Sequence, residues 1–149
     1  MKTKAEININ GSKENVWRVI SDIEHSAENI SGIEKIEILN KPSDTLTGLK
    51  WIETRTLFGK TATETMWITE SDENKFYKTR AESHGAVYIS HLKITGAEEL
   101  TNLSMEFNSL AQTFGARIMG FIFGWLFKKA TIKAVNQDLM DIKSIVENK

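Results

Sequence analysis

The feature that most constrains the fold of this chain is an apolar stripe in its last third. Apolar residues recur there at spacings of three and four, with one step of seven, which is the period of one face of an α-helix. The stripe consists of Ile118, Phe121, Trp125, Ile132, Val135, Leu139, Ile142 and Val146. After Lys129 the other positions are mostly polar, whereas before Lys128 they are apolar as well. The pattern predicts one long helix whose C-terminal half packs on one neighbour and whose N-terminal half has apolar surroundings on nearly every side.

The most apolar part of this predicted helix runs from Ile118 to Phe127. These residues would span about 15 Å as a helix, roughly half a bilayer core, so the run is too short to cross a membrane. Two interpretations stay open. The run fills the core or lines a cavity, or it forms an exposed surface that touches a membrane transiently or joins two copies of the chain. Gly120 and Gly124 have a GxxxG spacing, which close helix–sheet packing explains as well as helix pairing does.

The chain before this helix is a series of strand-like runs in which polar and apolar residues alternate. The first covers residues 2–10 and is followed by two short helices, one with Ser12 as its N-cap and one opened by a capping box over residues 21–24. Six further runs cover roughly 33–39, 48–57, 60–70, 74–82, 86–95 and 100–108. Because most connections are short, these runs predict an antiparallel meander with one apolar face, which the long helix covers.

Composition excludes several kinds of site. The chain has 149 residues, a formal net charge of −1 and no cysteine, so we expect one domain over residues 1–149, no nucleic-acid partner and no thiolate site. No apolar leader opens the sequence, and we expect a cytoplasmic protein. The histidines His25, His84 and His91 lack metal-ligand spacing and no nucleotide-binding motif occurs, so we expect neither metal nor cofactor. The oligomeric state stays open.

A charged cluster is predicted near the centre of the sheet. Strand alternation puts Trp51, Glu53 and Arg55 on one face of their run, and it puts Glu64 and Met66 on one face of the next. If the more apolar faces point inward, Arg55 lies between two carboxylates in the interior, where a charge must be paired. The cluster would then hold a ligand's carbonyl, hydroxyl or carboxylate, or form a structural ion pair. A register shifted by one residue would instead put all three charges in water.

The element order and several stretches resemble the START-like (Bet v 1-like) superfamily, most closely its bacterial polyketide cyclase/dehydrase and lipid-transport branch. The stretches are VWRVISDIEHSAENISGIEKIEIL, LKWIETRTLFGK and DLMDIKSIVENK. The resemblance implies an α+β helix-grip fold, in which a curved antiparallel sheet of about seven strands wraps around a long C-terminal helix and two short helices follow the first strand. It also implies a large, mostly apolar cavity. Many relatives carry Trp and Pro where this chain has SAENIS, so the ligand's identity is not carried over.

Alternation and the resemblance together indicate which residues would line such a cavity. They are Trp51, Glu53, Arg55, Glu64, Met66, Tyr88, Ser90, Leu92, Met105, Phe107, Ile118, Phe121, Ile122 and Trp125. Superfamily members bind lipids, sterols, quinones or polyketides, and a minority are enzymes. We therefore expect binding or transport of a hydrophobic small molecule without catalysis.

Two alternatives to this carrier function follow from the same residues. The first is a polyketide cyclase/dehydratase-type enzyme, for which Glu53, Arg55 and Glu64 are the candidate catalytic groups because a carboxylate with a raised pKa can transfer protons. The second is a protein-interaction module, which predicts an exposed apolar surface around Phe123 and Phe127 in place of a cavity.

Overall fold

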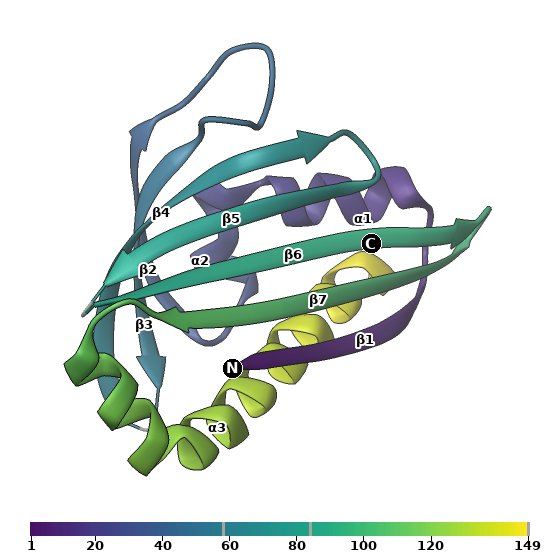
Figure 1. Ribbon diagram of the computed structural model, residues 1–149. Coiled ribbons are helices and arrows are strands. Elements are labelled where there is room, and N and C mark those ends of the chain that lie inside the picture. The colour runs from purple at the N-terminus through teal and green to yellow at the C-terminus, as the bar shows by residue number, and fades with distance from the viewer. Residues whose placement is uncertain (58, 84, 149) are drawn as a thin grey trace.

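An antiparallel sheet and one long helix make up most of the structure (Figure 1). The structure is a computed structural model that describes residues 1–57, 59–83 and 85–148; the side chains of residues 57, 122 and 123 also lie outside the described part. In chain order the elements are β1 (Lys2–Asn10), α1 (Lys13–Ser21), the 3-10 turn η1 (Ile23–His25), α2 (Ser26–Asn29), β2 (Ile33–Asn40), β3 (Lys50–Leu57), β4 (Lys60–Asp72), β5 (Phe76–Ser83), β6 (Ala86–Ala97), β7 (Leu100–Ala111) and α3 (Phe114–Glu147).

The sheet has seven strands in the order β1-β7-β6-β5-β4-β3-β2, and every neighbouring pair is antiparallel. Strands β2 to β6 each pair with the next strand along the chain, as an antiparallel meander requires, and β1 joins the far side of β7. Figure 1 shows the curved sheet with α3 and the short helices against the same face. This arrangement confirms the predicted α+β architecture and element order.

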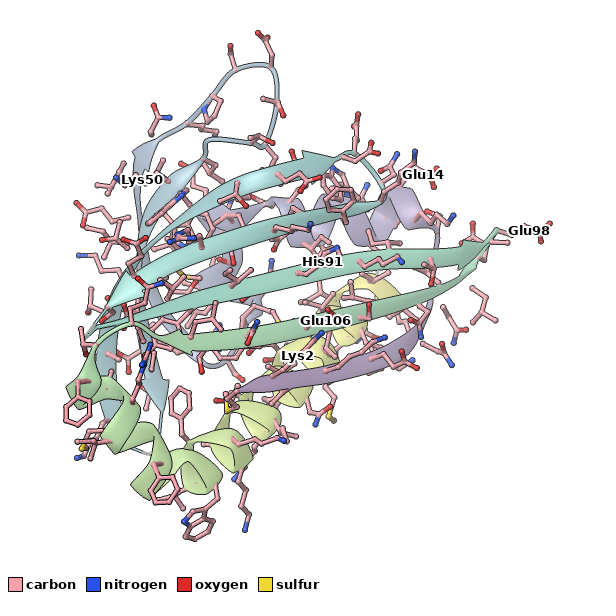
Figure 2. All side chains as sticks on the ribbon, in the orientation of Figure 1. Lys2, Glu14, Lys50, His91, Glu98 and Glu106 are labelled. Atoms are coloured by element: carbon pink, nitrogen blue, oxygen red, sulfur yellow. The ribbon has the colours of Figure 1, made fainter. Side chains whose placement is uncertain are left out.

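Alternation along the strands decides which side chains face the helices. Trp51 is buried, whereas its neighbour Lys50 is exposed, so β3 turns its predicted inward face toward α3. The register pairs Trp51 with Met66 and Glu53 with Glu64 across β3 and β4. On the opposite face, His91 and Glu106 are cross-strand partners on β6 and β7 and point away from α3 (Figure 2). The possible shift of one residue in register is therefore excluded.

The first short helix begins as predicted, whereas the second does not. The Ser12 side chain accepts a hydrogen bond from the Asn15 backbone N–H at 3.2 Å and so caps α1. The capping box expected at Ser21 is wrong, because α1 continues through Ser21 and η1 follows Asp22 without a side-chain cap. The Tyr77 hydroxyl donates to the Ile20 carbonyl at 3.2 Å and satisfies one of the free carbonyls at the end of α1.

The two halves of α3 have opposite environments, although one apolar stripe continues through both. Leu139 is 1% exposed, and its half of the helix packs on β1 and α1. Phe121 is 92% exposed and Trp125 is 71% exposed, so the apolar surroundings predicted for the N-terminal half are wrong. Figure 1 shows the reason: α3 continues past the point where β1 begins, so this half has no edge strand beside it.

Two further findings concern the apolar run in this half of α3. A Cβ atom placed on Gly120 or Gly124 would meet nothing within 4 Å, so close helix–sheet packing does not explain their spacing. Within the described residues, no helix combines the length and apolar character that crossing a bilayer requires.

Candidate functional site

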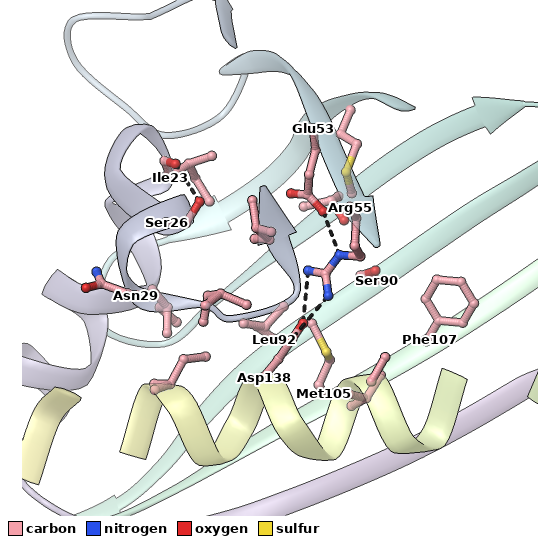
Figure 3. A pocket seen from close by; sticks show the side chains of 18 of the residues that line it. Ile23, Ser26, Asn29, Glu53, Arg55, Ser90, Leu92, Met105, Phe107 and Asp138 are labelled. Atoms are coloured by element: carbon pink, nitrogen blue, oxygen red, sulfur yellow. Dashed lines mark hydrogen bonds and ion pairs between the residues drawn. The ribbon is translucent and has the colours of Figure 1, made fainter. Parts of the chain in front are cut away.

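A cavity of about 210 Å³ lies between the sheet, the short helices and α3 (Figure 3). Ile23, Ser26 and Asn29 close it on the side of η1 and α2, and Val135 and Ile142 close it on the side of α3. Phe127 also lines it and is 36% exposed. Most of the wall is apolar, because the sheet and the helical segments α1, η1, α2 and α3 turn their core-facing residues toward the same space.

Most of the strand residues predicted for the cavity line it. They are Trp51, Glu53, Arg55, Met66, Ser90, Leu92, Met105 and Phe107. They come from β3, β4, β6 and β7, and the antiparallel pairing brings their inward positions into adjacent rows; Ser90, for example, is the cross-strand partner of Phe107.

Glu64 and Tyr88 do not belong to the described lining of this cavity. Glu64 lies opposite Glu53, but Arg55 turns toward α3 and makes no ion pair with Glu64. Tyr88 stacks on Phe107 with ring centroids 5.9 Å apart. Burial and the charge of Glu64 raise the pKa of Tyr88.

The helix residues predicted for the cavity are corrected as well. Ile118, Phe121 and Trp125 are exposed, because their half of α3 runs beyond the start of β1. The side chain of Ile122 lies outside the described residues. The helix contributes instead through residues from Phe127 onward, where α3 lies alongside the sheet.

A charged cluster of three side chains forms part of the cavity wall. Arg55 Nε donates to Glu53 Oε2 at 3.1 Å, Nη1 donates to Asp138 Oδ1 at 3.1 Å, and Nη2 lies 3.0 Å from Asp138 Oδ2. Glu53 also accepts from Trp51 Nε1 at 3.3 Å. The side chains of Glu53, Arg55 and Asp138 are 13%, 19% and 9% exposed. The cluster therefore joins β3 to α3 across the cavity, as Figure 3 shows.

Burial and pairing act against each other in this cluster. Burial disfavours the charged form of Arg55, but Asp138 and Glu53 together outweigh it, and the pKa of the guanidinium is raised. Burial also raises the pKa of the Asp138 carboxyl, and the paired guanidinium offsets only part of that effect. Arg55 therefore stays positively charged, whereas burial disfavours the ionised form of Asp138.

Gly32 lets the chain pass close to this cluster. A Cβ at that position would lie 3.2 Å from Arg55 Nη1 and 3.8 Å from Asp138 Oδ1. The residue just before β2 is therefore small where the ion pair needs room.

Sequence reasoning missed several lining residues, of which Asp138 is the most consequential. Asp138 is one of the polar residues off the apolar stripe, yet it lies three residues after Val135 and four before Ile142, on the buried side. That spacing was the available signal. The other missed residues that bear polar groups include Tyr77 and Thr79 on β5, whose inward alternation matches that of the neighbouring strands.

Metal binding finds no support in this geometry. In the described part of the chain, no three histidine or carboxylate side chains converge as a metal site needs. The Asp138 carboxylate and one Glu53 oxygen face Arg55.

Comparison with known proteins places the chain in a family. The profile of the family described as polyketide cyclase/dehydrase and lipid transport matches residues 1–144. The chain belongs to this family. A search of curated protein sequences found no match.

Solved structures show that this family member has the START-like helix-grip fold. The chain matches TTHA0849 from Thermus thermophilus with a TM-score of 0.82 at 17% identity, covering 98% of this chain and 97% of that one. A START superfamily protein from Mycobacterium smegmatis matches with a TM-score of 0.82 at 14% identity, covering 99% and 97%. The Zhui aromatase/cyclase from Streptomyces sp. R1128 matches with a TM-score of 0.76 at 14% identity, covering 99% and 93%. At these identities the likeness establishes the fold alone.

Proposed function

We propose that this protein binds an uncharged, mostly apolar small molecule in the cavity and carries it without chemical change. The observation that carries the proposal is an apolar cavity with one charged cluster in its wall. Apolar walls with a few fixed polar groups are the usual form of a small-molecule site. A lipid, quinone or polyketide-like molecule with a ketone or hydroxyl oxygen has the matching chemistry.

The charge of the cluster favours a neutral ligand. Glu53 and Asp138 bring two negative charges and Arg55 one positive charge, so the fully ionised cluster is net negative. A ligand carboxylate would meet this charge in a space of low dielectric, where repulsion is strong. A ketone or hydroxyl oxygen avoids it and accepts from the N–H groups that Arg55 does not direct at the carboxylates. The structure thus argues against the carboxylate ligand that the sequence left open.

The volume of the cavity limits how much of a ligand it encloses. The cavity has a volume of about 210 Å³. This is less than the roughly 300–1,000 Å³ of sites for larger ligands. A lipid-sized ligand would therefore place one end at the cluster and extend out of the cavity.

Calorimetric titration of three ligands of equal chain length tests the proposal. Octan-1-ol and octan-2-one should bind at least about tenfold more tightly than octanoate at pH 8, because only octanoate adds a negative charge. Octanoate binding as tightly as the other two would refute the selectivity for a neutral ligand. Native mass spectrometry of the purified protein, followed by extraction, would identify any ligand taken from the cell.

A matched pair of variants locates the binding site. Met105→Trp fills the cavity from β7, whereas Glu106→Trp adds the same side chain to the opposite face of the same strand. Binding should be lost in the first variant and kept in the second. Equal binding by both would place the ligand elsewhere.

A second candidate function is a cyclase or dehydratase that uses Asp138. The observation in its favour is a cavity-lining carboxyl whose pKa burial raises, as a proton-transferring group requires. Both oxygens of Asp138 face Arg55, however, so a ligand must first separate the pair.

Linear poly-β-ketone substrates followed by mass spectrometry distinguish this function from the first. The enzyme function predicts that the wild-type protein forms cyclised products. Asp138→Asn should no longer form these products but should still bind octan-2-one. Unchanged substrate in every reaction with the wild-type protein would favour the carrier.

A further inference from the structure

The N-terminal half of α3 carries an apolar face that no described part of the fold covers. Phe114, Ile118, Phe121 and Trp125 follow one another at spacings of four, three and four, so they lie on one side of the helix. We call these four residues the exposed stripe. Phe121 and Trp125 are among its most exposed members, and Figure 2 shows aromatic side chains projecting from this part of the helix into open space. An exposed apolar face of this kind marks an interaction surface.

Basic residues flank the exposed stripe on both sides. At 100° per residue, Arg117 and Lys128 lie along one edge, and Lys129 and Lys133 lie along the other. All four are exposed, and none forms an ion pair with another described residue. No acidic residue occurs between positions 114 and 137, although the whole chain has a net charge of −1. Positive charge is thus concentrated around this exposed apolar face.

The exposed stripe and its basic edges together fit a lipid surface better than they fit a second copy of the chain. A helix that lies in the surface of an anionic membrane presents aromatic residues to the acyl region and basic residues to the headgroups. A symmetric dimer through the same face would bring two uncompensated basic edges together, because the same patch contributes from both copies. Charge complementarity therefore favours a lipid surface over a second copy of the chain.

We propose that the exposed stripe and its basic edges dock this protein on the surface of anionic membranes. The helix lies along the surface and does not cross it. The proposal goes beyond ligand binding and does not depend on it, since the residues that carry it lie outside the described lining of the cavity.

Co-sedimentation with vesicles tests the proposal. Vesicles of phosphatidylcholine with 30% phosphatidylglycerol should bind the protein, and vesicles of phosphatidylcholine alone should bind it much more weakly. Lys128→Gln with Lys129→Gln should weaken binding to the anionic vesicles by about fivefold per lysine. Absence of binding to the anionic vesicles, or equal binding to both kinds, would overturn the proposal.

Single variants assign the effect to the exposed stripe. Phe121→Glu and Trp125→Glu should each lower vesicle binding at least about fivefold, and because both positions are exposed the fold should be retained, as circular dichroism will show. Met140→Glu is the matched control: Met140 is 57% exposed on the same helix, but it lies among Asp138 and Asp141 and away from the stripe. It should bind vesicles like the wild type. A dimer in analytical ultracentrifugation that Phe121→Glu dissociates would instead assign the face to a second copy and overturn the proposal.

Discussion

Replacing Arg55 by methionine tests whether the charged cluster is as strongly buried as its geometry indicates. The change keeps an unbranched side chain but removes the cation that faces Glu53 Oε2 at 3.1 Å and both oxygens of Asp138 at 3.0–3.1 Å. Two carboxylates would then share one poorly hydrated space with no positive partner. The folded protein can relieve this only by binding a proton on one of them.

That proton sets the size of the expected loss of stability. The ordinary pKa of the Asp138 carboxyl is 3.8, and holding such a group protonated costs about 1.36 kcal/mol for each pH unit above that value. The free energy of unfolding should therefore fall by up to about 4 kcal/mol at pH 7, within the range for breaking a buried ion pair, and by up to about 2 kcal/mol at pH 5; these are upper limits because the pKa of Asp138 is already raised in the wild-type protein. The pKa is raised in the folded state, so the folded variant binds more protons than the unfolded chain and loses stability as pH rises.

Urea unfolding of the variant and the wild type at pH 5, 6, 7 and 8 measures this difference. Arg80→Met is the control, because Arg80 pairs with Glu82 on an exposed part of β5 and should contribute less than about 1 kcal/mol with little dependence on pH. Combining Arg55→Met with Glu53→Gln and Asp138→Asn should recover most of the loss. A loss below about 1 kcal/mol at pH 8, or one that does not change with pH, would refute the reasoning.

Two further predictions concern backbone and hydrogen-bond features outside the cluster. Gly120→Ala and Gly124→Ala should each raise the free energy of unfolding by about 0.5–1 kcal/mol, because alanine favours the helix and a Cβ there meets open space. Gly96→Ala is the contrast, because its Cβ would lie 2.4 Å from the backbone oxygen of Leu100 and the change should lower the free energy of unfolding. A lower free energy of unfolding in Gly120→Ala or Gly124→Ala would show that these helical positions are packed. Tyr77→Phe removes the donor to the Ile20 carbonyl and should cost about 1 kcal/mol in urea unfolding; unchanged stability would show that this carbonyl finds another partner.

Much of the fold was predictable because local rules determine it. Residues alternate in β3 and β4, and the connections are short, so the meander and the inward position of Trp51, Glu53 and Arg55 follow from the sequence. The cap at Ser12 follows from a local hydrogen bond in the same way. The second short helix did not follow, because α1 extends as far as Ser21, the expected cap, with its apolar residues Val19 and Ile20 buried.

The partner of Arg55 depended on tertiary structure. Glu64 is its neighbour in the sheet, whereas Asp138 is 83 residues away in the chain and meets it only because α3 crosses the sheet. The alternation of residues along the strands predicts carboxylates near Arg55. The direction in which the long Arg55 side chain turns, however, depends on which element packs over it. The spacing of Asp138 from Val135 and Ile142 was compatible with a buried position, yet an aspartate is rarely buried unless a partner such as an arginine pairs with it.

Periodicity predicts that one apolar stripe runs the length of the last helix, but it does not predict what the stripe contacts. Leu139 is buried and Phe121 is exposed, although both belong to the same stripe. The difference is the point at which β1 begins, because a helix longer than the sheet beneath it must extend beyond the edge strand (Figure 1). Periodicity specifies which side of a helix is apolar, and only the relative lengths and positions of packed elements decide whether that side meets a core, a cavity or open space.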